Sequence, residues 1–178
     1  MQRIAIVIAA AAWLGACASL PEGLPVPEGG FEITGRVAVR YGNEGASGRF
    51  FWRHSPQADD LLITSPLGQG IARLSRQGGE FRLVTPGDRE YRAADAESLT
   101  ESVLGWRLPL EGLPDWVQGS AVPGRPAVLR RDSGQRVLEL VQDGWRVEYQ
   151  EFQGERPSRL RLLRDDLEIR LTIDRWSS

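Results

Sequence analysis

The only cysteine of this chain, Cys17, lies directly after a short apolar stretch at the N-terminus. Arg3 supplies a positive charge before that stretch, residues 4–14 are almost wholly apolar, and Gly15 and Ala16 are small. This order of features is typical of a cleavable secretory signal. The thiol is the reactive group at the end of that signal, so the first chemistry to consider is covalent attachment of a lipid to Cys17.

The four residues Leu14-Gly15-Ala16-Cys17 resemble a bacterial lipobox, in which a diacylglyceryl group is joined to the cysteine sulfur and cleavage leaves the cysteine as the first residue. We therefore predict a signal peptide over residues 1–16 and a lipid-anchored protein that begins at Cys17. Two or more acyl chains give stable membrane anchoring. Ala18 and Ser19 follow, and neither is the aspartate that retains many enteric-type lipoproteins in the inner membrane. The sequence thus favours the periplasmic side of the outer membrane.

Two alternatives compete with lipid attachment. A membrane-spanning helix needs roughly 20 apolar residues, and the stretch from Ile4 to Leu14 is about half of that length. An ordinary cleavable signal followed by an incidental cysteine would make the three residues before Cys17 a coincidence. Both alternatives are disfavoured, and acylation in the native host is left open.

Other reactive groups are scarce. The only histidine, His54, precedes Ser55-Pro56 at a predicted turn, and no G-x-S-x-G motif occurs, so we expect a solvated turn histidine with no catalytic role. No second histidine or further thiol is present to bind a metal, and Asp59-Asp60 and Asp165-Asp166 each fit a hairpin turn. We expect no metal site, no cofactor and no enzymatic activity.

The charge balance excludes a nucleic-acid partner. The 22 basic residues are all arginine, the acidic residues number 24, and the net charge is −2 at pH 7. An all-arginine composition fits phosphate-binding chemistry or a GC-rich genome, and scattering from Arg36 to Arg175 favours the genomic origin. The length of 178 residues suits one domain, for which we expect a monomer.

The chain after the signal divides into a tether and a β-rich domain. Residues 17–30 hold three prolines and three glycines, which predicts a flexible tether. The domain covers 31–178, where apolar and polar residues alternate at period two between turn residues. The predicted strands are Glu32–Arg40, Ala46–His54, Asp60–Thr64, Gly70–Arg76, Glu80–Thr85, Arg89–Ala93, Ala127–Arg131, Arg136–Gln142, Trp145–Phe152, Ser158–Arg164 and Leu167–Trp176.

Two helices interrupt this pattern and are expected to form a lid near residues 95–119. Asp95 can cap a helix over Ala96–Leu104 that ends at Gly105. Pro114 fits the first turn of a second helix over 114–118. A curled antiparallel sheet leaves an open mouth that such an insert can cover.

The alternation places large apolar side chains on one face of the sheet. Phe50 and Trp52 share a face on one strand, as do Trp145, Val147 and Tyr149 on another. For most of these residues a packed core is the favoured interpretation. The chain also has six tryptophans, which is many for its length, and only two short helices are available to cover the apolar face, which would leave that face incompletely filled. These five residues are therefore candidates for the wall of an apolar cavity, with Leu99, Val103 and Trp116 as lid candidates.

The segment between Thr64 and Gly70 is the one unusual loop. Pro66 fixes a backbone angle and Gly68 permits a tight reversal, so Leu67 is expected at the tip of a turn. Two interpretations stay open: an exposed leucine, and a side chain folded back onto the core.

Several of these segments together resemble one family, the outer-membrane lipoprotein receptor LolB. The matching features extend over nearly the whole mature chain: the lipobox cysteine, Gly35-Arg36-Val37-Ala38, Arg49-Phe50-Phe51-Trp52, Ser65-Pro66-Leu67-Gly68, Leu108-Pro109-Leu110 before Trp116 and Gly119, Gly144-Trp145-Arg146-Val147-Glu148-Tyr149, and Ile173-Asp174-Arg175-Trp176. The resemblance implies a mainly β fold, an incomplete antiparallel β-barrel of about eleven strands with a helical lid over an apolar cavity.

The resemblance also implies the function and the partners. A LolB-like protein accepts acylated lipoproteins from the periplasmic carrier LolA and inserts them into the outer membrane by non-covalent transfer of acyl chains. The loop Pro66, Leu67 and Gly68 would then act in delivery into membrane lipids and not in acceptance of cargo. The tether here is shorter than in some members, which restricts its reach.

Two other classes of function stay open beside this one. A lipid-anchored scaffold or assembly subunit would have a packed core and no acyl-binding activity. A lipid-binding enzyme would turn over a substrate and depend on His54 or on acidic residues.

Overall fold

The computed structural model describes residues 28–177, which fold into one sheet and two short helices. The predicted signal peptide, Cys17 and most of the predicted tether lie outside these residues. The strands are β1 (Phe31–Tyr41), β2 (Glu44–His54), β3 (Ala58–Thr64), β4 (Gly70–Gln77), β5 (Glu80–Thr85), β6 (Arg89–Ala93), β7 (Ala127–Arg131), β8 (Val137–Gln142), β9 (Trp145–Gln153), β10 (Arg156–Arg164) and β11 (Leu167–Ser177).

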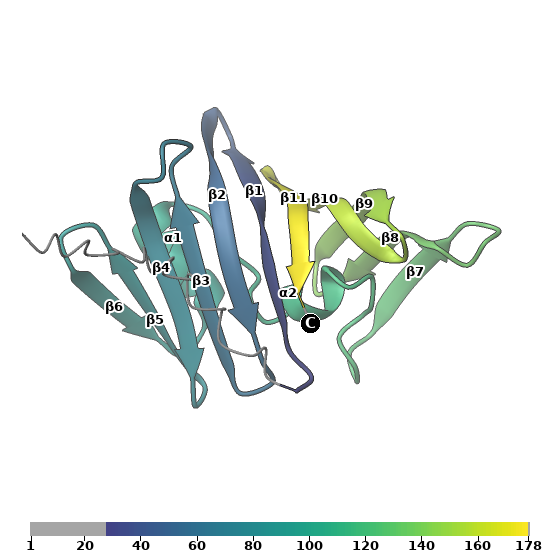
Figure 1. Ribbon diagram of the computed structural model, residues 1–178, viewed down its shortest axis with the longest axis horizontal. Coiled ribbons are helices and arrows are strands. Elements are labelled where there is room, and N and C mark those ends of the chain that lie inside the picture. Colours follow the sequence, from purple (N-terminus) through teal and green to yellow (C-terminus); the bar gives the residue numbers. More distant parts are fainter. Residues whose placement is uncertain (1–27, 178) are drawn as a thin grey trace, which may run out of the picture.

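All eleven strands pair antiparallel in the order β6-β5-β4-β3-β2-β1-β11-β10-β9-β8-β7. Each strand therefore neighbours the next one in the chain, except that β1 also pairs with β11 and β6 does not pair with β7. The first and last strands meet at the centre of a curved sheet that stays open between β6 and β7 (Figure 1). This arrangement confirms the predicted incomplete antiparallel barrel with about eleven strands.

Both helices lie on the same face of the sheet, behind it in Figure 1. Helix α1 (Ala96–Leu104) begins after Asp95, whose side chain accepts a hydrogen bond from the Ser98 N–H, and ends at Gly105 with φ of 81°. These caps are the predicted ones. Helix α2 (Leu113–Trp116) starts one residue earlier and ends two residues earlier than predicted. No helix within residues 28–177 is long and apolar enough to cross a membrane.

The core fills the space between the inner face of the sheet and the two helices. Strand β11 illustrates how the alternation builds it, because Leu167, Ile169, Leu171 and Ile173 are buried while Arg170 is exposed. Such alternation gives an antiparallel sheet one apolar face and one solvated face. The solvated face is called the outer face below.

Strands β1 and β11 approach each other closely at Gly35, where a side chain has no room. An ideal Cβ on Gly35 would overlap the carbonyl oxygen of Thr172 and touch the ring of Phe50. Gly35→Ala is therefore expected to lower the free energy of unfolding by about 1–3 kcal/mol through overpacking. Gly70→Ala is the matched control, since no atom lies within 4 Å of its Cβ position. Urea denaturation of both variants checks this, and equal stabilities would contradict it.

Candidate functional site

The five wall candidates are all buried on the inner face, on two separated strands. Phe50 and Trp52 lie on β2, while Trp145, Val147 and Tyr149 lie on β9. Strands β1, β11 and β10 lie between β2 and β9 in the sheet. The candidates thus share a face, as the alternation predicted, but they form two groups.

The group on β9 meets the lid. The rings of Trp116 and Trp145 lie 6.4 Å apart between centroids, and the Tyr149 hydroxyl donates a 2.8 Å hydrogen bond to the carbonyl of Trp116. Of the other two lid candidates on α1, Leu99 is buried and Val103 is half-buried against the core. Both helices are therefore packed down onto the sheet.

The group on β2 belongs to a different aromatic cluster. Trp52 packs edge-on against Phe31 with centroids 5.0 Å apart, and Phe31 packs in turn on Trp176 at 5.4 Å. The indole N–H of Trp52 donates to Asp59 at 2.9 Å. These contacts fix Trp52 as a core residue at the end of the sheet where β1 begins.

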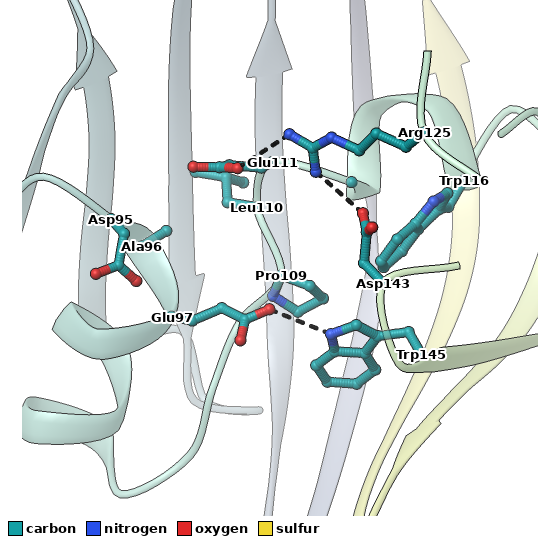
Figure 2. A pocket seen from close by; sticks show the side chains of 11 residues that line it. Asp95, Ala96, Glu97, Pro109, Leu110, Glu111, Trp116, Arg125, Asp143 and Trp145 are labelled. Atoms are coloured by element: carbon teal, nitrogen blue, oxygen red, sulfur yellow. Dashed lines mark hydrogen bonds and ion pairs between the residues drawn. The ribbon is translucent and has the colours of Figure 1, made fainter. Parts of the chain in front are cut away.

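A pocket of about 170 Å³ lies where the lid meets β9 (Figure 2). Trp116, Trp145, Leu110 and Pro109 line it together with charged groups at its rim. Pockets that hold small ligands usually measure about 300–1,000 Å³. The pocket between the lid and β9 is smaller than this range.

Polar contacts hold the lid shut at the rim of this pocket. Glu97 on α1 accepts hydrogen bonds from the Trp145 indole at 3.2 Å and from Arg164 at 2.8 Å. Arg125 bridges Asp143 at 3.0 Å and Glu111 at 3.4 Å (Figure 2). These contacts join the segments around α1 and α2 to strands β8 to β10. They are called the lid latch below.

Gln142 supports the lid from beneath and was missed by the sequence reasoning. It is buried and accepts hydrogen bonds from the Trp116 indole at 2.9 Å and from the Val122 N–H at 2.8 Å. It shares the inner face of β8 with Leu140. The sequence did carry a signal for this residue, because the alternation places the amide of Gln142 on the buried face of its strand. A buried polar group needs hydrogen-bond partners, and here the segments around α2 supply them.

The loop between β3 and β4 displays its leucine to solvent. The Ser65 N–H bonds the Gln69 carbonyl at 2.7 Å, the Gly68 N–H bonds the Ser65 carbonyl at 2.9 Å, and Gly68 has φ of 86°. Leu67 is 91% exposed, and Pro66 and Gly68 are exposed beside it. Of the two interpretations left open, the exposed leucine is therefore correct.

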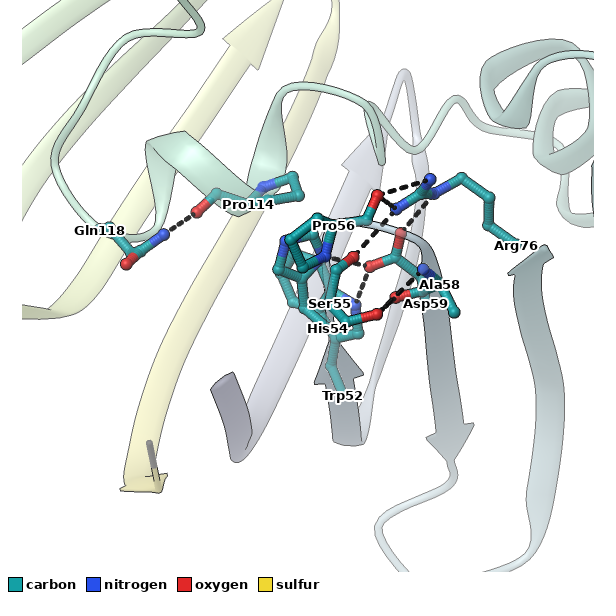
Figure 3. Close-up of polar contacts among 9 residues, drawn as sticks. All are labelled: Trp52, His54, Ser55, Pro56, Ala58, Asp59, Arg76, Pro114 and Gln118. Carbon is teal, nitrogen blue, oxygen red and sulfur yellow. Dashed lines mark hydrogen bonds and ion pairs between the residues drawn. The ribbon is translucent and has the colours of Figure 1, made fainter. Parts of the chain in front are cut away.

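His54 and Asp59 correct the sequence expectations. His54 is buried at the end of β2, and its Nδ1 lies 2.7 Å from an Asp59 oxygen (Figure 3). Asp59 is also buried, and Arg76 donates to its second oxygen at 2.6 Å. The predictions of a solvated turn histidine and of a turn at Asp59-Asp60 are both wrong. The chain reverses earlier, at residues 55–57, and this places both aspartates on β3. The Asp165-Asp166 pair does lie in a hairpin turn, as predicted.

This polar cluster is structural. The Ser55 hydroxyl donates to the Ala58 carbonyl at 3.2 Å and accepts from the Ala58 N–H at 3.0 Å, so it serves the turn and is not paired with His54 as a nucleophile would be. Within residues 28–177 no group of three or more His, Cys, Asp or Glu side chains could hold a metal ion.

Glu168 is a buried carboxylate on the outer face. Arg40, Arg161 and Arg170 all donate to it, at 2.8, 2.6 and 2.7 Å. Burial by itself would raise the pKa of Glu168, but the hydrogen bonds from Arg170 and Arg161 outweigh burial and lower the pKa to about 2. The carboxylate therefore stays ionised and holds three arginines in place.

Glu168→Gln is expected to lower the free energy of unfolding at neutral pH by about 1–3 kcal/mol, because hydrogen bonds to a charged acceptor are lost. The depressed pKa of Glu168 means that its contribution is present above the ordinary value of 4.5 and is lost as the pH falls toward about 2. Urea denaturation across this pH range should show that the difference in unfolding free energy between wild type and variant shrinks as the pH falls. A difference that stays constant would contradict this account.

Comparison with known proteins gives one family. The family model described as "Outer membrane lipoprotein LolB" matches residues 29–176. The outer-membrane lipoprotein LolB of Thiobacillus denitrificans is 40% identical over 185 residues, covering 100% of this chain and 99% of the relative. That of Nitrosomonas europaea is 40% identical over 152 residues, covering 82% and 72%.

Among solved structures, a LolA superfamily protein from Nitrosomonas europaea aligns with a TM-score of 0.49 at 12% identity, over 85% of this chain and 86% of that one. The family assignment comes from the sequence comparisons, which cover the sheet, both helices and the leucine loop. The chain belongs to the LolB family of outer-membrane lipoproteins.

Proposed function

We propose that this chain, an outer-membrane lipoprotein receptor, accepts acylated lipoproteins from the periplasmic carrier LolA and inserts them into the outer membrane without covalent chemistry. The observation that carries the proposal is the pocket between Trp116 of the lid and Trp145 of β9, where the lid packs on the sheet and the Glu97–Trp145 hydrogen bond crosses the rim. An apolar floor under a movable roof can shelter acyl chains during transfer.

Acceptance requires the lid to open. Each buried methylene is worth about 0.8 kcal/mol, so acyl chains must stay shielded on the way from carrier to membrane. A pocket of about 170 Å³ is too small for that purpose. Entry of the chains would separate Trp116 from Trp145 and break the lid latch at Glu97. Burial of the acyl chains against the apolar floor would offset the hydrogen bonds lost.

Delivery is assigned to the loop of Pro66, Leu67 and Gly68. A leucine that is 91% exposed at a loop tip has no structural role in the described domain, and insertion into lipid would bury it. The lipid anchor proposed at Cys17 would keep this loop near the membrane.

The tether is long enough for the leucine loop to reach the anchoring membrane. The loop lies at the end of the sheet opposite Phe31, where the described chain enters β1 (Figure 1). The eleven residues of β1 span about 35 Å at most. Residues 17–30 can span up to about 48 Å when extended, so the loop and the anchor can occupy the same bilayer.

Transfer of cargo from a loaded carrier tests the proposal. The Cys17→Ala chain without residues 1–16 keeps the whole described domain and is mixed with a complex of LolA and an acylated lipoprotein. Pull-down of this chain is expected to recover the cargo. If the cargo stays on a competent carrier, the receptor mechanism fails and a lipid-anchored scaffold becomes the better account.

A further inference from the structure

Arginines that are scattered in the sequence gather on the outer face of the sheet. Arg36 pairs with Arg49 across β1 and β2, and Thr172 of β11 lies between Arg36 and Arg159. Arg170 pairs with Arg161. Paired residues on neighbouring strands point to the same face. The outer-face arginine cluster comprises Arg36, Arg40, Arg49, Arg146, Arg159, Arg161 and Arg170.

The cluster carries more positive charge than its partners neutralise. Its ion pairs use four carboxylates: Glu148, Glu151, Glu168 and Asp174. Glu168 alone is shared by three of the arginines. Arg49 and Arg146 are exposed, and neither forms an ion pair with any residue of the described domain. The surface therefore favours an anionic partner.

A groove on this face joins the arginines to the leucine loop. Arg36, Arg49, Arg159 and Arg170 line it together with Pro66, and its volume is about 380 Å³. Pro66 directly precedes the exposed Leu67. A cationic groove and an apolar loop tip thus form one continuous surface.

We propose that the outer-face arginine cluster docks on the anionic phosphate headgroups of the membrane while Leu67 enters the lipid. The proposal rests on the delivery role proposed above and adds the surface that orients the domain. Guanidinium groups match phosphate geometry, and apolar residues flanked by cations are typical of proteins that bind at the lipid interface.

Continuity with the leucine loop favours a membrane over an acidic protein as the partner. A protein docked in the groove would cover Pro66 and hinder the approach of Leu67 to lipid. With the outer face on the membrane, helices α1 and α2 lie on the opposite face of the sheet (Figure 1). The lid would then remain open to the carrier.

A spin label can measure this docking in the intact lipid-anchored protein. Because Cys17 is the only cysteine, its acylation leaves an introduced cysteine as the only thiol. Ser47→Cys places a nitroxide in the groove, and Ser120→Cys places one beyond α2 on the lid side; both serines are exposed. The protein is reconstituted in phosphatidylcholine vesicles with and without phosphatidylglycerol, and nickel-chelating headgroups report collisions with the label.

The Ser47 label is expected to show more collisions when phosphatidylglycerol is added, and the Ser120 label is not. Arg49→Gln should lower the ratio of docked to undocked molecules about five-fold, and Glu151→Gln, which frees Arg159, should raise it by about the same factor. Arg131→Gln on the distant strand β7 is the control for loss of charge and should change nothing. High salt should weaken docking, since it screens exposed charges.

Equal collisions in both lipids, or equal effects of Arg49→Gln and Arg131→Gln, would overturn the proposal. The proposal would also be overturned if the collisions of the Ser47 label did not change with lipid composition while the loaded carrier reduced its mobility. The arginine cluster would then be a protein-binding surface. Cargo transfer is measured in the same samples. Transfer that persists without docking would refute only this inference, whereas failure to accept cargo would refute the proposed function.

Discussion

Leu67→Glu is expected to leave acceptance of cargo unchanged and to reduce its delivery into liposomes about 100-fold. Burying a leucine side chain in an apolar medium is worth about 1.5–3 kcal/mol, and a carboxylate in its place resists entry into lipid. Leu67 is 91% exposed, so neither the fold nor the acyl-binding face should change. Pull-down from loaded LolA measures acceptance, and flotation of cargo with liposomes measures delivery.

Val128→Glu is the matched control for this variant. Val128 is also an exposed apolar residue, at 70%, but it lies on the edge strand β7. The Val128→Glu variant should deliver cargo at the wild-type rate. Normal delivery by Leu67→Glu, or an equal loss in Val128→Glu, would show that the leucine loop has no specific part in insertion.

The largest expected effect on stability belongs to Asp59. Its two oxygens accept from the Trp52 indole, contact His54 and pair with Arg76, and the side chain is almost fully buried. Asp59→Ala strands these partners in the core, and breaking a buried ion pair costs about 3–5 kcal/mol. Urea denaturation should show a loss of this size in the free energy of unfolding.

Asp60→Ala provides the comparison, since Asp60 is the neighbouring aspartate on β3. It pairs with Arg73 on the exposed outer face at 2.6 Å. An exposed pair contributes about 0–1 kcal/mol. Similar losses in the two variants would mean that the buried cluster does not hold this end of the sheet together.

Most of the fold was predictable because its signals are local. Period-two alternation with turn residues located all eleven strands, and Asp95 and Gly105 marked both ends of α1. The pairing of β1 with β11 depends on contacts across the whole chain. Spacing alone therefore suggested a curled sheet, and the family resemblance supplied the incomplete barrel.

The site was predictable only in part, because its contacts join strands that are far apart in the sequence. Alternation put Trp52 and Trp145 on the inner face, but strand order decides that Trp145 meets the lid while Trp52 packs on Phe31. His54 and Asp59 become partners only because β2 and β3 pair in that register. The arginine cluster was invisible for the same reason, since five strands contribute to it.

The most direct test of the central claim is to locate the cargo acyl chains on the receptor. A lipoprotein whose acyl chains carry a photoreactive diazirine is transferred from LolA, illuminated, and the cross-linked receptor peptides are identified. We expect cross-links to the lid and the inner face, at Leu99, Trp116 and Trp145. Cross-links confined to the outer face, or none above the level of free fatty acid, would contradict transfer through an opened lid.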